Sequence, residues 1–424
     1  MKHVLILCDL FPPAFGPRMG YLCKYLKQSD WTPIVVTEKI PACNFQFLEN
    51  ICEVHTINYY TAKHPFLRKL QWLVIFLLSF GFDYKNWKIR RYAEKLICQK
   101  QFDALLCSTY RTFPLPAAHK LANKYKLPLI VDLRDIIEQY SGNEFIARKI
   151  PAIPGLQQII TFLFREHSLK IRNQILPQAA CITTVSDWHV KTLRQYNPNV
   201  QLIYNGFDPE IFYPKTYPTD RFIITYTGRL LSKAMRDPSL LFESLRQLAT
   251  ESILTPQNCR VYWYVDPESW NVISAEAEKY GITSFIEMKG YVEASQIPEI
   301  LNKSSVLLLL TNKSSTTGPK GVMTTKLFEA LAVNKPILCV RNDEGVLEKA
   351  LKESNAGLAA SNVDEVSTFL KHYFTLWKEF GYTKAETDLN VLKKYSRKEQ
   401  AKQFEYLFDS LIKKRYDFNT DSHS

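Results

Sequence analysis

The chain has 424 residues and a hydrophobic content of 46%, which is enough for two globular domains with substantial cores. Lysine and arginine outnumber aspartate and glutamate by 54 to 42, and the net charge of +12 suits phosphate-bearing ligands or an anionic membrane surface. The nine cysteines and eight histidines form no disulfide, zinc or H-x-x-x-H pattern, and no arginine-rich run or helix-turn-helix pattern favours nucleic acid, so these classes are set aside.

A short apolar run, residues 4–8, opens the chain and predicts a first buried strand. It is too short for a signal peptide, so we expect a cytoplasmic protein. A proline-rich loop with Gly16 and Arg18 follows, and then an amphipathic helix at residues 19–26. In an open parallel sheet, such a loop lies at the carboxyl edge of the strands, where ligands bind. Arg18 then faces an anionic group, unless the loop is only a stiff turn with a surface arginine.

The most apolar stretch of the chain is residues 70–82. These 13 residues are fewer than the ~20 that a membrane-spanning helix needs. Trp72 and Trp87 suit a headgroup boundary, and basic residues flank the run on both sides: His64, Arg68, Lys69, Lys85, Lys88, Arg90 and Arg91. We expect either a patch over residues 66–91 that rests on the inner face of the cytoplasmic membrane, or a buried core helix.

Two further strands are predicted at residues 103–108 and 129–131, each after a helical segment. This alternation is typical of a doubly wound parallel sheet. The second strand ends at Asp-Leu-Arg-Asp, which places Arg134 and Asp135 at the carboxyl edge. Both side chains then face a ligand; alternatively, Arg134 braces the strand end by pairing with Asp132.

The second half of the chain repeats the alternation. A strand at residues 222–227 leads directly to Gly228, and another at 306–310 leads through a loop with Gly318 and Gly321 into a helix. Lys326 and Glu329 stand three residues apart on that helix. Because a helix N-terminus carries unpaired N–H groups and partial positive charge, the loop is a candidate cradle for a phosphorylated ligand. The alternative is an ordinary surface ion pair.

The segment at residues 316–332 resembles the nucleotide-sugar site of the GT-B glycosyltransferases, specifically the retaining family 4, or glycosyl transferases group 1. The family pattern is E-x7-E, and Glu329 matches the second glutamate, which binds the nucleotide ribose in the family. The first glutamate, which holds donor-sugar hydroxyls, is replaced by Gly321. Lys326 matches a lysine that a subset of the family carries, and Thr317 and Gly318 belong to the same donor loop.

Further motifs resemble the same family. The loop that contains Gly16 and Arg18 resembles F-P-P-x-x-G-x-R, and the run T-T-V-S followed by N-G-F-D closes the first domain. Asp-Leu-Arg-Asp resembles the D-x-R-D signature of a subgroup that builds surface polysaccharides. By this resemblance Gly16 lies near the donor, and Arg18, Arg134 and Asp135 contact the acceptor.

In the second domain, the resemblance assigns the donor diphosphate to the segment after residue 227. Gly228 lets the backbone approach the diphosphate, and Arg229 with either Lys233 or Arg236 neutralises it. The backbone at Tyr291 and Val292 recognises the base. Solvated surface cations are the alternative for all three basic residues.

The implied fold is α/β, with two Rossmann-like doubly wound domains that face a cleft. We expect an acceptor-binding domain at residues 1–205, a linker at 206–221, a nucleotide-sugar-binding domain at 222–385, helices at 386–416 that pack back on the first domain, and a tail at 417–424. The implied enzyme transfers a sugar, with retention, from a nucleoside diphosphate sugar to a hydroxyl of a glycan or lipid-linked acceptor in polysaccharide biosynthesis.

The chemistry demands charge neutralisation on the leaving diphosphate more than a protein nucleophile. Arg229 and Lys326 supply that charge without a metal or other cofactor, and Asp135 is the candidate polar group near the reacting centre. Two alternatives stay open. One is a non-hydrolysing sugar-nucleotide epimerase of the same architecture, which needs histidine and carboxylates for proton abstraction. The other is a non-catalytic nucleotide-sugar-binding protein.

Overall fold

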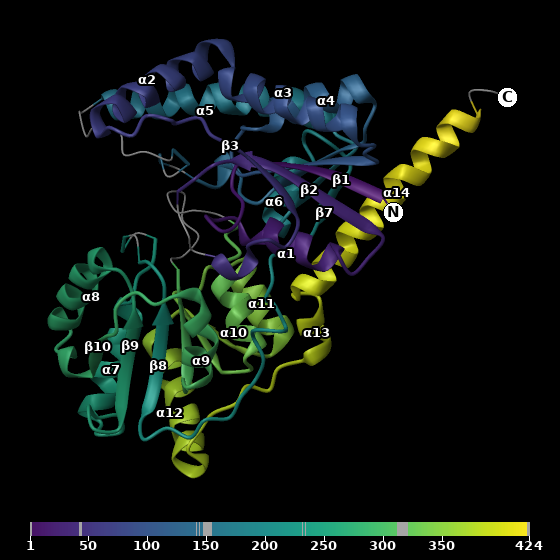
Figure 1. The fold of residues 1–424 in the computed structure, drawn as a ribbon. Coiled ribbons are helices and arrows are strands. Elements are labelled where there is room, and N and C mark those ends of the chain that lie inside the picture. The colour runs from purple at the N-terminus through teal and green to yellow at the C-terminus, as the bar shows by residue number, and fades with distance from the viewer. Residues whose placement is uncertain are drawn as a thin grey trace. The chain divides into compact units, whose positions relative to one another are not determined.

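The computed structural model describes residues 2–41, 45–140, 142–143, 145–146, 155–230, 232–233, 235–311 and 321–421, with side chains as far as residue 413 (Figure 1). The chain divides into two compact units. The first comprises Met1–Tyr204 together with Arg397–Ser424, and the second comprises Asn205–Ser396. Each unit is built on one parallel sheet.

The sheet of the first unit has seven strands in the order β3-β2-β1-β4-β5-β6-β7. Their bounds are β1 Lys2–Cys8, β2 Trp31–Glu38, β3 Glu53–Ile57, β4 Ala104–Thr109, β5 Leu129–Leu133, β6 Cys181–Thr184 and β7 Val200–Leu202. The central strands are apolar and buried because helices cover both faces. Side chains alternate between those faces: Leu5 and Leu7 belong to one core cluster, and Val4 and Ile6 to the other.

The helices of the first unit form two layers (Figure 1). They are α1 Pro17–Leu26, α2 Pro65–Phe82, α3 Tyr84–Gln99, α4 Leu115–Tyr125, α5 Leu156–Ile175, α6 Asp187–Leu193 and α14 Arg397–Asp421, with short 3-10 turns at Gln46–Leu48, Ile137–Gln139 and Leu176–Gln178. Helices α1 and α14 cover one face, where the rings of Trp31 and Phe408 are in tilted contact with centroids 5.0 Å apart. Helices α3 and α4 cover the other face.

The sheet of the second unit has six strands in the order β10-β9-β8-β11-β12-β13. Their bounds are β8 Phe222–Thr227, β9 Cys259–Tyr264, β10 Ile286–Met288, β11 Val306–Leu310, β12 Ile337–Val340 and β13 Gly357–Ala360. The helices are α7 Ser239–Thr250, α8 Pro267–Lys279, α9 Ile297–Asn302, α10 Thr325–Ala332, α11 Val346–Ser354, α12 Val363–Phe380 and α13 Leu389–Lys393, with 3-10 turns at Thr283–Phe285 and Ala294–Gln296. Helices α7, α8 and α12 share a core with alternate residues of the strands.

Local signals explain where several helices begin. The side chain of Asp266 caps α8 by accepting from the amide N–H of Ser269, and a proline follows the cap. Ser186 caps α6 in the same way through the N–H of His189. Gly381 ends α12 in the left-handed conformation, with φ of 76°. These caps are readable in the sequence because each depends only on near neighbours.

The predicted fold class is confirmed, since both units are doubly wound parallel α/β sheets. Strands β8 and β11 have the predicted bounds. The apolar run predicted at residues 70–82 is part of a longer helix, α2, which begins at Pro65. The alternative that this run is a buried core helix is wrong, because Ile75 is its one buried side chain.

Candidate functional site

Lys326 is a crowded cation in the first turn of α10. Its Nζ donates to the Tyr226 hydroxyl at 2.9 Å and lies 4.4 Å from the centroid of the same ring. Burial and the nearby charge of Arg236 hold the pKa of Lys326 well below its ordinary value, while the carboxylate of Glu329 opposes that shift. A ligand with negative charge would replace the solvation that Lys326 lacks.

Gly228 provides the space that Lys326 occupies. It follows β8 directly, and its φ of +100° is one that favours glycine. A Cβ at this position would lie 2.6 Å from both Cε and Nζ of Lys326. The role of Gly228 in admitting the donor diphosphate stays a prediction. The structure shows a further role: the missing side chain leaves room for Lys326 to contact Tyr226.

Two of the predicted diphosphate cations are paired with carboxylates on α8 or at its cap. Arg229 is 66% exposed at the side chain and contacts Asp266, with Nε 3.1 Å from Oδ2. Lys233 contacts Glu276, with Nζ 2.8 Å from Oε1. Neither side chain contributes to the shift in the pKa of Lys326.

Arg236 is the third of these cations. Its guanidinium donates to the main-chain oxygen of Arg229, and its charge helps to lower the pKa of Lys326. Burial raises the pKa of Tyr226 to about 12, and the charge of Arg236 opposes that rise. Between the two candidates that the sequence left open, the geometry therefore favours Arg236 over Lys233 as the partner of Lys326.

The remaining predicted donor-binding residues lie on α10, near β8 and β9, and in the segment before α10. Glu329 lies one turn after Lys326 on α10 and acts on it through its charge. Val292 lines a cavity of about 720 Å³ beside β8 and β9, a volume typical of ligand sites, and Tyr291 is exposed. Thr317 and Gly318 lie outside the described residues.

In the first unit, the strand register builds a buried polar cluster at the carboxyl edge. Ser108, Asp132 and Thr183 are register partners on β4, β5 and β6. Asp132 is fully buried and accepts from the hydroxyls of Ser108 and Thr183 at 2.9 and 2.8 Å. It also accepts from Arg18, whose Nη2 lies 3.0 Å away.

Arg18 is therefore an internal residue. It is 4% exposed, and its two terminal nitrogens also donate to the main-chain oxygens of Tyr204 and Ile203 at 2.9 Å. The alternative that Arg18 is a surface arginine in a stiff turn is wrong. Its contact with an acceptor stays a prediction, whereas its pairing with Asp132 gives it a positioning role at this edge.

A second polar group lies beside that cluster. Arg134 donates to Asp9 at 2.6 Å, so the alternative that it braces the strand end through Asp132 is wrong. Burial raises the pKa of Asp9 despite the charges of Arg134 and Arg111. The Nε atoms of both arginines are buried without a hydrogen-bond partner among the described residues. Gly16 permits this packing, because a Cβ there would lie 2.5 Å from the main-chain oxygen of Leu10 and 3.4 Å from Arg134.

Asp135 is held by a chain of hydrogen bonds. Gln139 donates to Asp135 Oδ1 at 3.1 Å, and the Gln139 oxygen lies 2.8 Å from Nε2 of His189. The other ring nitrogen of His189 lies 3.0 Å from the Thr184 hydroxyl. Burial raises the pKa of Asp135 and lowers the pKa of His189 to about 4, so His189 is neutral at pH 7 and acts as a positioning residue.

This burial predicts an acid-sensitive fold. The pKa of His189 falls from 6.5 to about 4 on folding, so between these values the unfolded chain binds a proton that the folded chain does not. Stability is therefore lost as the pH falls, by about 2 kcal/mol at pH 5. Urea unfolding at pH 7 and pH 5 measures this loss, and we expect His189→Gln to reduce it. His119→Gln on α4 is the control; an equal effect of both variants would contradict the assignment.

Several of these residues had no place in the sequence prediction. Asp9 directly follows β1 and Arg111 follows β4, so the rule that ligands bind at the carboxyl ends of strands could have found both. Tyr226 and His189 had no such signal, because their roles depend on what packs against them. Among the described residues, no group of three or more histidine, cysteine, aspartate or glutamate side chains is placed to hold a metal ion.

The chain is similar to known proteins both in sequence, over part of its length, and in fold. Residues 208–372 match the family model described as Glycosyl transferases group 1. A glycosyltransferase from Rickettsia africae ESF-5 is 15% identical with a TM-score of 0.62, over 97% of this chain and 99% of that chain. Anabaena Alr3699/HepE, solved in complex with UDP and glucose, is 14% identical with a TM-score of 0.62, over 97% of this chain and 100% of that one.

A third solved structure belongs to another enzyme class. It is a putative UDP-N-acetylglucosamine 2-epimerase from Listeria monocytogenes, 12% identical with a TM-score of 0.54, over 98% of each chain. No curated protein matches by sequence. At these identities the solved structures show the fold, that of two parallel-sheet α/β domains as in GT-B glycosyltransferases. Residues 208–372 therefore carry a domain that matches Glycosyl transferases group 1, and this match supports transferase activity.

Proposed function

We propose that this protein is a retaining glycosyltransferase that moves a sugar from a nucleoside diphosphate sugar to a hydroxyl of a lipid-linked glycan acceptor in surface polysaccharide assembly. The observation that carries the proposal is the placement of Lys326. Its ammonium stands at the start of α10, crowded by protein and close to Arg236, within the matched domain. Two neighbouring cations, one of them at the start of a helix, suit a diphosphate.

The proposed chemistry is charge neutralisation at the leaving group. As the bond between the sugar and the diphosphate breaks, negative charge grows on the departing phosphate, and donors fixed in advance stabilise it at little reorganisation cost. Lys326 and Arg236 supply these donors. Glu329 is the candidate acceptor for the ribose hydroxyls. Because the chain provides the positive charge itself, we expect transfer without an added metal, which assays in the presence of a chelator will test.

The acceptor is assigned to the first unit. Arg134 and Arg111 each bury an Nε donor that has no partner among the described residues, and Asp135 lies at the same strand edge. The guanidinium groups of these two arginines carry positive charge and further N–H donors, which suit the hydroxyls or phosphates of a glycan. Asp135 is the candidate polar group near the reacting centre, and the departing phosphate itself is the candidate base for the acceptor hydroxyl. His189, neutral and enclosed, holds Asp135 through Gln139.

Calorimetry with UDP-, GDP- and ADP-sugars tests donor binding. We expect one nucleotide class to bind, and Glu329→Gln to weaken that binding by about 10-fold or more, since it removes the charge from a hydrogen-bond acceptor. The matched control is Glu251→Gln, because Glu251 ends α7 in the same unit and pairs with Lys371 on the surface. Unchanged affinity in Glu329→Gln would contradict the donor site.

Product analysis with a membrane extract tests the reaction itself. Transfer of labelled sugar to a lipid-extractable product, with the anomeric configuration of the donor kept in the NMR spectrum, supports the proposal. Release of the epimerised sugar nucleotide would assign the chain to the epimerases that share its fold. Binding of donor without hydrolysis, transfer or epimerisation would leave a binding protein, and the transferase proposal would fail.

A further inference from the structure

Helix α2 presents a largely apolar surface to solvent. Its 18 residues bury one side chain, Ile75, and include no aspartate or glutamate. Large apolar side chains are exposed along its whole length, from Phe66 at 67% through Leu77 at 58% to Phe82 at 80%. Exposed apolar surface of this extent on a folded unit marks a site of contact with another apolar phase or partner.

A second helix, distant in sequence, extends this surface. Helix α5 exposes Phe162 at 61%, together with Ile159 and Leu163. It contacts α2 through aromatic rings: Phe164 lies 5.8 Å from Phe76 and 6.1 Å from Phe80, measured between ring centroids. The two helices lie in the same layer over one face of the first sheet (Figure 1). We refer to the exposed side chains of residues 66–82 and 156–163 as the α2–α5 surface.

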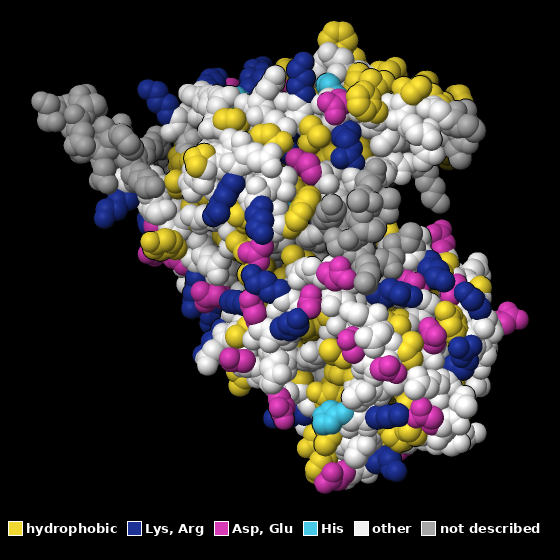
Figure 2. Space-filling view, turned by 180° about the vertical axis from the view of Figure 1, so that it is seen from behind, with side chains coloured by type: hydrophobic (Ala, Val, Ile, Leu, Met, Phe, Trp, Pro, Cys, Tyr) yellow, Lys and Arg dark blue, Asp and Glu magenta, His cyan; other side chains and the backbone are white. Residues whose placement is uncertain are grey.

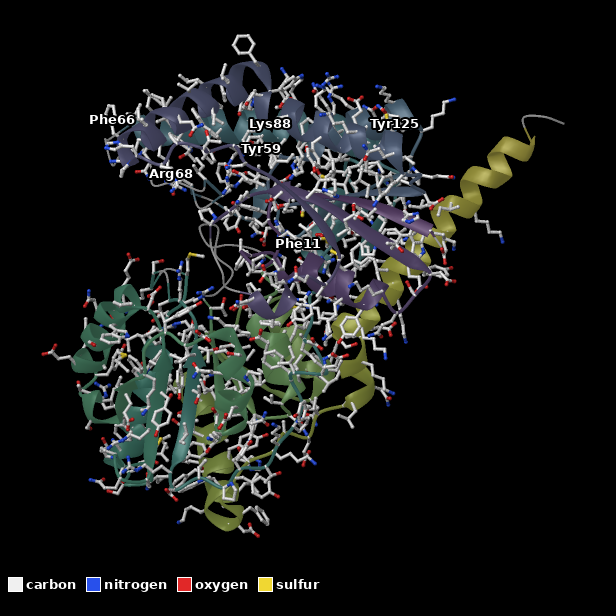
Figure 3. The ribbon with its side chains drawn as sticks, viewed as in Figure 1. Phe11, Tyr59, Phe66, Arg68, Lys88 and Tyr125 are labelled. Atoms are coloured by element: carbon white, nitrogen blue, oxygen red, sulfur yellow. The ribbon has the colours of Figure 1, made fainter. Side chains whose placement is uncertain are left out.

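Positive charge borders the α2–α5 surface. Arg68 and Lys69 are exposed on α2 itself, and Lys88 and Arg91 follow on α3. Figure 3 shows Phe66 and Arg68 on α2 and Lys88 on the next helix. Figure 2 shows hydrophobic side chains gathered over this layer with Lys and Arg side chains beside them. The α2–α5 surface itself holds no acidic residue, and at its border Asp83 and Glu166 are outnumbered by the four basic side chains named above. An apolar face with an excess of positive charge complements the acyl chains and headgroups of an anionic membrane.

The topology argues against a spanning helix. Helix α2 is long and apolar enough to cross a bilayer by length and composition alone. However, β3 before it pairs with β2, and α3 after it buries Ile89 and Ala93 in the core of the same unit. Because both flanking elements belong to one folded unit, both ends of α2 stay on the same side of a membrane, and the helix lies in the plane of the interface.

We propose that the α2–α5 surface anchors the first unit to one leaflet of an anionic membrane. The exposed phenylalanine and leucine side chains of both helices enter the region of the acyl chains, and the bordering arginine and lysine side chains contact headgroup phosphates. This inference goes beyond the proposed function, because it depends on neither the donor nor the acceptor.

Vesicle flotation with the full chain tests the proposal. We expect the protein to float with vesicles that contain phosphatidylglycerol, and to bind at least about 10-fold less to phosphatidylcholine vesicles or in high salt. A Phe66→Ser/Leu77→Ser variant on α2 and a Phe162→Ser variant on α5 are each expected to weaken binding at least about 10-fold. Arg68→Gln/Lys69→Gln should reduce the preference for phosphatidylglycerol.

The control is Phe380→Ser, which removes an exposed phenylalanine from the end of α12 in the second unit. Thermal unfolding and circular dichroism of every variant show whether the fold is kept, which we expect because the substituted side chains are exposed. Equal flotation of the α2, α5 and control variants would overturn the proposal. So would a dimer in size-exclusion chromatography that the α2 and α5 variants abolish, because a second copy of the chain would then occupy the surface.

Discussion

Replacing Lys326 with methionine is expected to lower kcat/KM for the donor by about 10² to 10³-fold, the usual effect of removing a fixed donor from a developing negative charge. The same change is expected to leave the protein at least as stable. Lys326 is crowded, and burial holds its pKa well below 10.5, so charging it in the folded state costs free energy that methionine does not. Activity and stability should therefore move in opposite directions, measured by donor hydrolysis or transfer and by urea unfolding.

The lowered pKa of Lys326 also determines how the stability of the fold depends on pH. Between the lowered pKa of folded Lys326 and 10.5 in the unfolded chain, the unfolded state binds the extra proton, so the contribution of this group to stability rises with pH. Lys326→Met should lose that rise. An anionic ligand favours the charged form, so we expect nucleoside diphosphate binding to raise the pKa of Lys326 in the wild type. Calorimetry at a series of pH values, in buffers of different ionisation enthalpy, measures the proton uptake linked to that rise.

The control for this prediction is Lys371→Met, since Lys371 pairs with Glu251 on the surface of α12. That variant should keep both activity and proton uptake. If Lys326→Met retained wild-type kcat/KM, the diphosphate would have to bind elsewhere. The position of Lys326 would then no longer support the proposed function.

The second large effect is expected from Asp132→Asn. Asp132 is fully buried and accepts from Arg18, Ser108 and Thr183. Neutralising it leaves the guanidinium of Arg18 buried without its counter-charge, a loss that is typically about 3 to 5 kcal/mol. Urea unfolding measures the change. A loss below about 1 kcal/mol would mean that water reaches Arg18 in solution and that the pair is not part of the core.

Two further variants test whether the loss of stability in Asp132→Asn comes from the broken ion pair. Glu53→Gln removes the partner of Lys100, an exposed pair of the same unit, and should cost less than about 1 kcal/mol. The double variant Arg18→Met/Asp132→Leu removes both charges and should recover part of the stability lost in Asp132→Asn, because no charge is then left unpaired. If the double variant were no better than the single one, the loss would come from packing rather than from the ion pair.

Much of the fold could be predicted from local pattern. Short apolar runs between glycine- and proline-containing loops predict β8 and β11 at their observed bounds. Ser186 caps α6 from the position just before it, which is a local signal of the same kind. These features depend on residues within one or two turns of each other, so their spacing in the chain is also their spacing in space. The carboxyl-edge rule likewise brought attention to Arg18, Arg134 and Asp135.

The partners of those residues could not be predicted in this way. Arg18 and Asp132 are 114 residues apart, and their pairing follows from the packing of α1 on the sheet. The register of β5 with β4 and β6 brings Ser108 and Thr183 to the same carboxylate. The choice of Arg236 over Lys233 depends in the same way on which side chain comes near α10 and which pairs with α8. Contacts between distant segments are set by packing, and hydrophobic periodicity carries no information about them.

The sequence by itself determined two things. The alternation of apolar runs and turns indicates an α/β protein. The net positive charge and the basic residues beside the run 70–82 indicate affinity for phosphate groups or membranes. Whether those apolar residues form core or surface was open, since an apolar helix has the same composition in both settings. The packing of α2 against α5 and over the core decides it: one side chain of α2 is buried and the rest of its apolar face meets solvent, because no other described element covers it.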